Sequence, residues 1–101
     1  MNILPNGYSI FKFNDVSNPV SLGFIFNKNN EIISHGNYVN NKLTGFGCKY
    51  ESTTRYEGIF MNGFLNGYGL KFNAGKYSFG LFENGALIEP VYLEERSLAS
   101  E

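Results

Sequence analysis

The chain repeats a unit of 22 residues, and this repetition constrains its fold more than any other feature. Gly36, Gly58 and Gly80 stand 22 residues apart. The same step connects further positions: Gly45 with Gly67, Gly47 with Gly69, Gly63 with Gly85, Tyr38 with Phe60 and Phe82, and Leu43 with Leu65 and Leu87. A period of this length is the signature of a repeat architecture, in which each unit packs against its neighbours. The sequence therefore predicts an array of one small structural unit.

The best-preserved copy of the unit predicts a β-hairpin followed by a turn. Residues 55–61 alternate in the manner of a strand, and Asn62-Gly63 follows them. Asn-Gly is a strong hairpin signal because both residues tolerate a positive φ. Residues 67–72 predict the second strand, and residues 73–76 a turn into the next copy. Asn41 replaces the turn glycine in the preceding copy, and Asn is the next best residue for a left-handed position.

We predict an all-β fold, an elongated antiparallel meander of β-hairpin repeats in a single twisted sheet. The domain organisation has three parts: a degenerate repeat with an N-terminal cap (1–33), a repeat region (34–88, with units 34–55, 56–76 and 77–88) and a C-terminal tail (89–101). Terminal repeats commonly diverge because one of their faces has no neighbour.

The two ends of the chain carry their own local predictions. Residues 6–13 predict a strand out of register with the period, residues 15–19 predict a turn, and Gly23 aligns with Gly45. Pro90 is expected to end any strand. Residues 92–99 fit two turns of helix, a length that is not stable alone.

Glycines within the predicted strands need an explanation, because glycine normally weakens a strand. We expect their missing side chains to leave a trough across which aromatic rings from adjacent strands lie. The structural glycines of this prediction are Gly36, Gly45, Gly47, Gly58, Gly63, Gly67, Gly69, Gly80 and Gly85.

Composition excludes several functional classes. The net charge of −1 offers little attraction to nucleic acid or to an anionic membrane, so no nucleic-acid partner is expected. Cys48 is the single cysteine, which rules out an intrachain disulfide. There is no basic-then-apolar leader and no apolar run of membrane-spanning length. We therefore expect a cytoplasmic protein.

Catalytic and metal chemistry are poorly supported by the residues. His35 and Cys48 are the only residues of their types, and they lie on separate strands of one predicted hairpin without a placed acid or oxyanion loop. One histidine and one cysteine are too few for a metal site. Gly67-Tyr68-Gly69 lacks the following helix of a phosphate-binding loop. We predict no enzymatic activity, no metal and no cofactor, with Cys48 serving as a small apolar residue.

Residues 56–69 resemble the MORN (membrane occupation and recognition nexus) repeat, whose unit has the pattern Y-x-G-x-F/W-x-x-G-x-x-x-G-x-G. Residues 34–55 match this pattern at Gly36, Tyr38, Gly45 and Gly47, and residues 77–88 match at Gly80, Phe82 and Gly85. The resemblance implies a hairpin-repeat scaffold in a cytoskeletal, ciliary or membrane-associated assembly. It also implies binding of a peptide or helix from a protein partner.

The sequence leads to one main functional hypothesis and two alternatives. The main hypothesis is an adaptor or structural subunit that binds a protein partner through an aromatic trough, because aromatic residues dominate interface hot spots. The residues chosen for that trough are Tyr38, Tyr56, Phe60, Tyr68, Phe72 and Phe82. The first alternative is a peripheral phosphoinositide-binding module that uses Lys49 and Lys71, which share a column of the repeat. The second alternative is a purely architectural homodimer.

Overall fold

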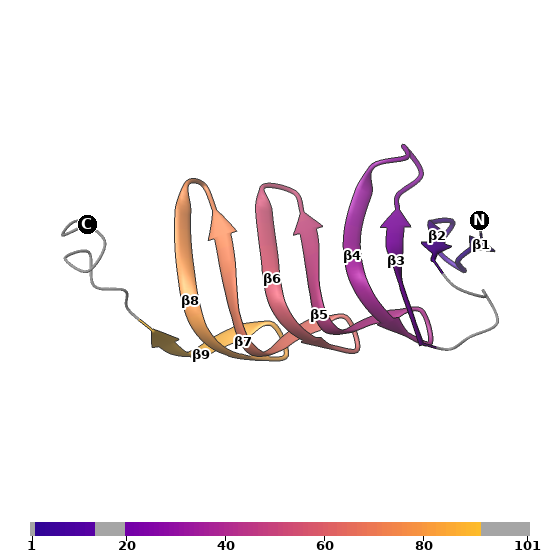
Figure 1. Cartoon of the computed structure of the whole chain (residues 1–101). Helices are drawn as coiled ribbons and strands as arrows, with labels where there is room; N and C mark the ends of the chain where they lie inside the picture. The colour runs from indigo at the N-terminus through magenta and orange to yellow at the C-terminus, as the bar shows by residue number, and fades with distance from the viewer. Residues whose placement is uncertain (1, 14–19, 92–101) are drawn as a thin grey trace, which may run out of the picture.

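The computed structural model describes residues 2–13 and 20–91, and within these ranges the protein is a single nine-stranded antiparallel sheet (Figure 1). The strands follow one another in chain order across the sheet, so the predicted all-β meander is confirmed. The molecule measures 48 × 27 × 25 Å. No helix in the described residues is long and apolar enough to cross a membrane. The strands are β1 (Asn2–Ile3), β2 (Ser9–Lys12), β3 (Val20–Phe26), β4 (Ile32–Val39), β5 (Lys42–Glu51), β6 (Thr54–Met61), β7 (Phe64–Asn73), β8 (Lys76–Glu83) and β9 (Ala86–Val91).

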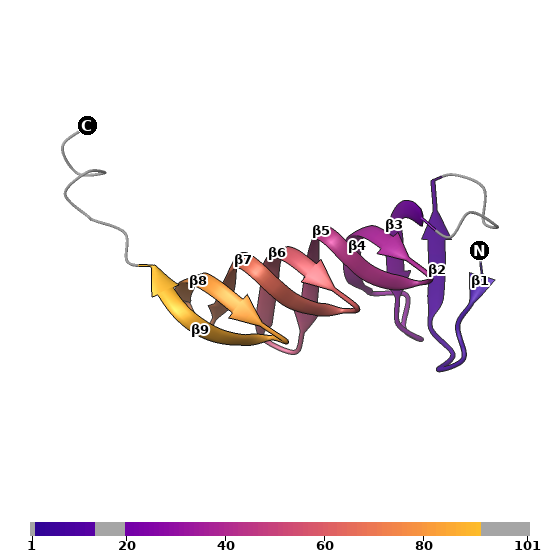
Figure 2. The ribbon, with the colours of Figure 1, turned by 90° about the horizontal axis from the view of Figure 1, so that it is seen from below.

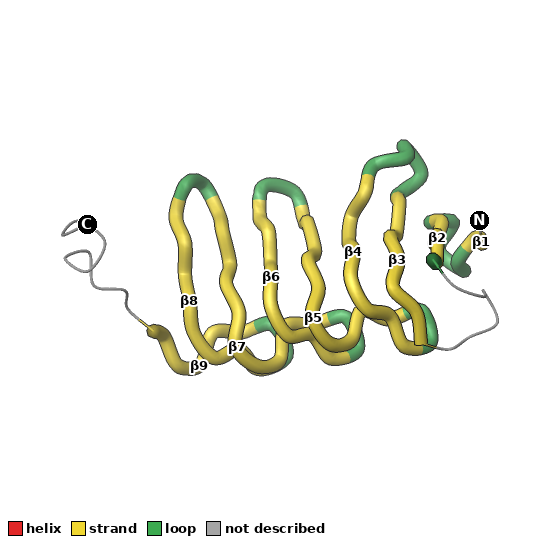
Figure 3. The backbone as a smooth tube through the Cα atoms, viewed as in Figure 1, coloured by secondary structure: helices red, strands yellow, loops and turns green. Residues whose placement is uncertain are grey.

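The turns between the strands alternate between two ends of the sheet (Figure 3). The upper turns in Figure 1 are residues 27–31, 52–53 and 74–75, and the lower turns are residues 40–41, 62–63 and 84–85. In the lower turns Asn62 and Gly63 have φ values of +50° and +89°, and Asn41 has a φ of +64°. The hairpins predicted from Asn-Gly, and the substitution of Asn for Gly in the earlier copy, are confirmed.

A row of six glycines crosses the sheet from β3 to β8. Direct cross-strand pairing connects Gly23, Gly36, Gly47, Gly58, Gly69 and Gly80 in that order. Register shifts in the β4–β5 and β6–β7 pairs lie immediately beyond this row. Such irregularities bend a strand and increase its twist. The strands curve toward their lower ends (Figure 1), and the lower hairpins run obliquely in a series beneath the array (Figure 2).

Leucine side chains, rather than aromatic rings, cover this glycine row. A Cβ on Gly47 would lie 2.7 Å from Leu43 Cδ1, and one on Gly69 would lie 3.0 Å from Leu65 Cδ2. The expectation of rings across all of the glycines is therefore wrong for the row. Aromatic rings lie opposite two glycines outside the row: Phe60 pairs with Gly45, and Phe82 pairs with Gly67. The leucines reach the row because they follow the lower turns and fold back over the bend.

The hydrophobic core lies on one face of the curved sheet. Its buried side chains are Ile10, Ile25, Tyr38, Leu43, Phe60, Leu65 and Phe82. On the opposite face Phe46 and Tyr68 are 65% and 64% exposed. We call the face of Tyr38, Phe60 and Phe82 the concave face and the other the convex face. Curvature lets a single sheet enclose apolar side chains that a flat sheet would leave in water.

The N-terminal strands differ from the sequence alignment in one respect. Gly23 pairs with Gly36 in the way that Gly47 pairs with Gly58, so Gly23 corresponds to Gly47 and its alignment with Gly45 is wrong. The cause is the longer turn at residues 27–31. Asn27 stabilises this turn, since its Oδ1 accepts hydrogen bonds from the backbone N–H groups of Asn29 (2.9 Å) and Glu31 (3.0 Å). Of the strand predicted over residues 6–13, only residues 9–12 form a strand, β2, whereas Asn6 and Gly7 belong to the turn that precedes it.

Strand β9 continues through Pro90, contrary to the expectation that this proline ends any strand. Pro90 pairs with Gly80 on the last strand of the sheet. An edge strand tolerates proline because its outward N–H group has no partner strand to bond. The turn predicted over residues 15–19 and the helical turns predicted over residues 92–99 lie outside the described residues.

Candidate binding site on the concave face

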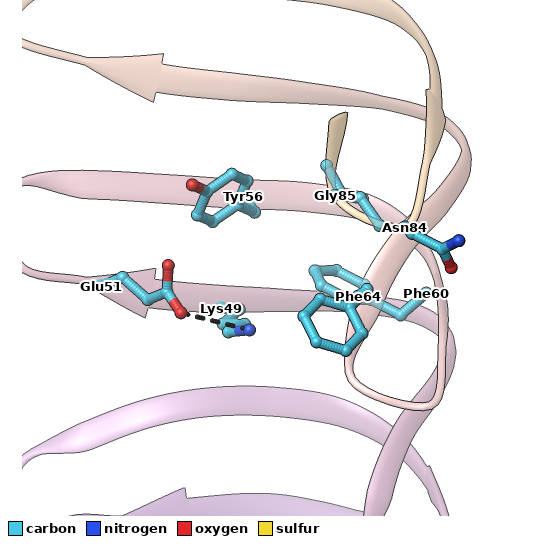
Figure 4. Close-up of a pocket in the computed structure, with 8 residues that line it drawn as sticks. Lys49, Glu51, Tyr56, Phe60, Phe64, Asn84 and Gly85 are labelled. Atoms are coloured by element: carbon cyan, nitrogen blue, oxygen red, sulfur yellow. Dashed lines mark ion pairs between the residues drawn. The ribbon is translucent and has the colours of Figure 1, made fainter. Parts of the chain in front are cut away.

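Two hollows follow one another along the concave face. The first, drawn in Figure 4, has a volume of about 220 Å³ and is lined by Lys49, Glu51, Tyr56, Phe60, Phe64, Leu65, Asn84 and Gly85. The second has a volume of about 470 Å³, and its lining includes Ser34, Tyr38, Lys42, Leu43 and Gly63. These five residues stand 22 positions before Tyr56, Phe60, Phe64, Leu65 and Gly85. The two hollows are therefore successive copies of one site, and together we call them the concave groove.

The lower hairpins form a continuous lip along this groove because each is hydrogen-bonded to the previous one. The Gly63 N–H donates to Leu43 O at 2.9 Å, and the Gly85 N–H donates to Leu65 O at 2.8 Å. The Asn84 N–H also donates to Asn66 Oδ1 at 3.1 Å. The repeat period thus sets the spacing of the lip as well as that of the sheet.

Lys49 connects the sheet to the lip. Its Nζ donates to Gly63 O at 3.1 Å, lies 3.3 Å from Glu51 Oε2 and stands 5.1 Å from the centre of the Phe64 ring (Figure 4). The Lys49 side chain is 26% exposed. A lysine held by these contacts keeps its charge at the wall of the groove, where a ligand can reach it.

Tyr56 lies between two lysines in a row that crosses three strands. It pairs with Lys49 on one side and with Lys71 on the other, so the two lysines share the concave face, as their common column predicted. Lys71 Nζ stands 6.0 Å from the centre of the Tyr56 ring. Partial burial and the charge of Glu51 raise the pKa of the Tyr56 hydroxyl, which keeps it protonated and able to donate a hydrogen bond.

The structure separates the six aromatic residues selected from the sequence. Tyr38, Phe60 and Phe82 are 0%, 2% and 2% exposed and belong to the core, where they support the groove from beneath. Tyr68 and Phe72 lie on the convex face. The Gly58–Gly69 and Tyr56–Lys71 pairs put Gly69 and Lys71 on the same face as Tyr56, so Tyr68 and Phe72, which alternate with them along β7, point to the other face. Of the six, Tyr56 is the residue that both lines the groove and remains partly accessible. The six do not form one surface.

Phe64 is an exposed aromatic residue of the groove that the sequence analysis did not select. It is 53% exposed and contributes its ring to the lip. The sequence predicts the second strand over residues 67–72, whereas β7 already begins at Phe64. A signal was present, since Phe64 is the aromatic member of a column that holds Lys42 and Ala86 in the other copies.

The convex face carries a ladder of aromatic rings. Contacts join Phe11, Phe13 and Phe24 with centroid distances of 5.3 and 5.5 Å, and continue from Phe24 through His35 to Tyr50 at 5.9 Å for each step. A second run joins Phe72, Tyr77 and Phe79. Such offset and edge-to-face pairs stabilise a sheet beyond the area that they bury.

His35 and Cys48 lie directly opposite each other in this convex surface. His35 Nε2 is 3.4 Å from the hydroxyl of Tyr50. Burial is the main cause that raises the pKa of the Cys48 thiol, with smaller opposing contributions that include a hydrogen bond with Tyr50. A buried protonated thiol is a poor nucleophile. Among the described residues, no group of three or more His, Cys, Asp or Glu side chains is arranged to hold a metal ion.

The first hollow offers the side chains of Tyr56, Phe64, Lys49 and Glu51 to a ligand. The second hollow has the same backbone positions one repeat earlier, but Ser34 and Lys42 stand there in place of Tyr56 and Phe64. Neither a scan against models of protein families nor a search of curated proteins finds a match for this chain.

Proposed function

We propose that this protein is a non-enzymatic adaptor or structural subunit that binds an elongated segment of a protein partner in its concave groove. The observation that carries this proposal is the pair of equivalent hollows one repeat apart. A site that recurs along an axis suits a ligand that is itself extended along that axis. The resemblance of residues 56–69 to the MORN repeat supports the same class of function. It suggests a cytoskeletal, ciliary or membrane-associated assembly as the setting.

The composition of the groove supports a protein ligand. Phe64 is exposed at the lip, and Tyr56 is half-buried with a protonated hydroxyl. Rigid aromatic anchors of this type provide much of the binding energy in protein interfaces, especially where they stand beside a well-packed core. Phe60 and Leu65 supply that packed floor. Asn84 and Glu51 add polar groups at the margin, as is typical of an interface rim.

The positions of Lys49 and Lys71 favour this proposal over the phosphoinositide-binding alternative. Both lie on the concave face, and Lys49 also contacts the lip. A flat bilayer would meet the rims of a concave surface before it met the lysines inside. Electrostatic attraction to lipid falls off within a Debye length, about 10 Å at moderate salt. Liposome flotation with and without phosphoinositides tests the alternative, which predicts phosphoinositide-dependent flotation at low salt.

The exposed edge of β9 keeps the architectural homodimer as a second candidate. All six residues of this strand are exposed, and it ends the described sheet. An edge strand presents unpaired backbone groups that can join another chain. Light scattering after gel filtration tests this function, and a monomer at concentrations of tens of micromolar would remove it.

The adaptor proposal is tested with a matched pair of surface variants. Phe64 and Tyr68 are similarly exposed but lie in the groove and on the convex face, respectively. We expect Phe64→Ser to lose a defined set of proteins in quantitative affinity purification from the native cell, and Tyr68→Ser to retain that set. If Phe64→Ser folds normally and retains every protein that the unmodified chain captures, the groove is not the binding surface. Phe60 and Phe82 are unsuitable for this test because their removal would damage the core.

A further inference from the structure

The two faces of the central sheet differ in charge. Between residues 44 and 82 the concave face carries Lys49, Lys71 and Lys76 against Glu51, so three positive charges less one negative leave +2. The convex face of the same segment carries Arg55 and Glu57, which cancel and whose side chains approach to 3.8 Å. Within this segment the concave face is therefore the more basic of the two, and Lys42 adds a further positive charge to the lining of the second hollow.

Two lysines of the concave face contact aromatic rings: Lys49 lines both hollows, and Lys71 lies beside Tyr56, next to the first hollow. Lys49 lies over Phe64, and Lys71 lies near Tyr56. Lys49 forms an ion pair with Glu51, whereas no carboxylate of the described residues lies within ion-pair distance of Lys71. Aromatic contacts orient an ammonium group without neutralising it. The row Lys49–Tyr56–Lys71 is thus prepared to receive anionic groups from a ligand.

The spacing of these lysines indicates the conformation of the ligand. Lys49 and Lys71 lie on β5 and β7, two strands apart, which corresponds to roughly 9.5 Å along the array. In a polyproline II segment, residues i and i+3 lie on one side about 9.3 Å apart. In an α-helix the nearest comparable interval, i to i+7, is about 10.5 Å. The extended segment fits the repeat better, and aromatic-lined grooves are known to recognise such segments.

We propose that the concave groove selects an acidic, extended segment of its partner, with carboxylates at every third residue pairing with Lys49 and Lys71. An apolar side chain between the carboxylates packs against Tyr56 and Phe64. This inference rests on the proposed function, and it adds the chemical class of the partner.

Synthetic peptides test the inference directly against the full chain. The probe is a fluorescein-labelled peptide of about five Glu-Pro-Leu triplets, and its charge-reversed counterpart contains Lys-Pro-Leu triplets. In fluorescence anisotropy at low salt, we expect the acidic peptide to bind at least about tenfold more tightly than the basic one, with the difference shrinking as salt is added. Equal binding of the two peptides, or no binding of the acidic one, would overturn the inference.

Charge-removing variants locate the binding of the acidic peptide. Lys49→Gln combined with Lys71→Gln is expected to raise its Kd about tenfold, whereas the convex control Arg55→Gln is expected to change it less than about twofold. An unchanged Kd in the double variant contradicts the inference. If circular dichroism shows that the double variant is misfolded, Lys71→Gln alone is used, and its expected effect is a rise in Kd of about threefold.

The spacing of the glutamates is tested with a second peptide of the same composition whose glutamates are grouped at one end. It should bind about threefold more weakly than the peptide with regularly spaced glutamates, and equal binding overturns the proposed spacing.

Failure of the inference is distinguishable from failure of the proposed function. If Phe64→Ser loses its protein partners but the acidic peptide does not bind, the groove remains the binding surface and the inference about charge is wrong. If Phe64→Ser loses no partner, the proposed function is wrong whatever the peptides do.

Discussion

Gly58 lies directly opposite Gly69, and a Cβ on Gly58 would come within 2.5 Å of the Gly69 Cα. Real Cβ atoms do not approach a backbone atom so closely, and Gly58 also has a φ of +146°, which other residues rarely adopt. Leu65 Cδ2 would lie 3.3 Å from the same Cβ. The bend that shapes the groove therefore depends on missing side chains.

Replacing Gly58 is expected to be costly, unlike replacing a turn glycine. Gly58→Ala should lower the free energy of unfolding by roughly 3 kcal/mol or prevent folding, because backbone strain and a backbone clash combine. Gly63→Asn should cost less than about 1 kcal/mol, since nothing lies within 4 Å of its Cβ position and Asn41 adopts a φ of +64° in the equivalent turn. Urea denaturation measures both values. Equal losses in the two variants would contradict a bend that depends on the glycine row.

Burial raises the pKa of Tyr38 to about 12, and its hydrogen bonds with the Ser34 side chain and the Ile25 backbone partly oppose the shift. A folded-state pKa above the unfolded value of 10.0 means that this contribution to stability is complete below pH 10 and is lost as the pH rises toward 12. The loss amounts to roughly 2–3 kcal/mol. Tyr38→Phe, which matches the residue at positions 60 and 82, should lose less stability than the unmodified chain over this range. Thermal unfolding at a series of alkaline pH values compares the two, and identical profiles would show that Tyr38 is not the titrating group.

Neighbouring positions on β6 should respond differently to truncation. Phe60→Ala removes a core ring that is 2% exposed, and its expected cost is about 3–5 kcal/mol. Ile59→Ala removes a convex-face side chain that is 43% exposed and should cost less than about 1.5 kcal/mol. Chemical denaturation separates these values. Similar costs would mean that the two faces of the sheet are wrongly assigned.

Cys48 should react slowly with iodoacetamide at neutral pH. The residue is 4% exposed, and burial raises the pKa of its thiol, so little reactive thiolate is present. Alkylation followed by mass spectrometry should show a rate at least about tenfold below that of the urea-unfolded chain. A rate in the folded protein equal to that of the unfolded chain would place the thiol at an accessible site.

Sequence periodicity predicted the meander, the Asn-Gly turns and the shared face of Lys49 and Lys71, because each depends on local spacing. It did not assign the faces of paired strands, since that requires the cross-strand register. The Gly58–Gly69 pair places Tyr68 on the face opposite to Tyr56, and no single strand reveals this. Curvature buried Phe60 and brought Phe64 to the lip, and both outcomes arise from the bend rather than from alternation along a strand.

Site-specific photo-crosslinking tests the central claim most directly. A benzophenone side chain placed at position 64 samples the groove, and one placed at position 68 samples the convex face at similar exposure. If the groove receives a partner segment, irradiation in the native cell yields a discrete crosslinked protein from position 64 and none from position 68. The same crosslinked protein from position 68 alone, or no discrete product from position 64, would contradict binding in the groove.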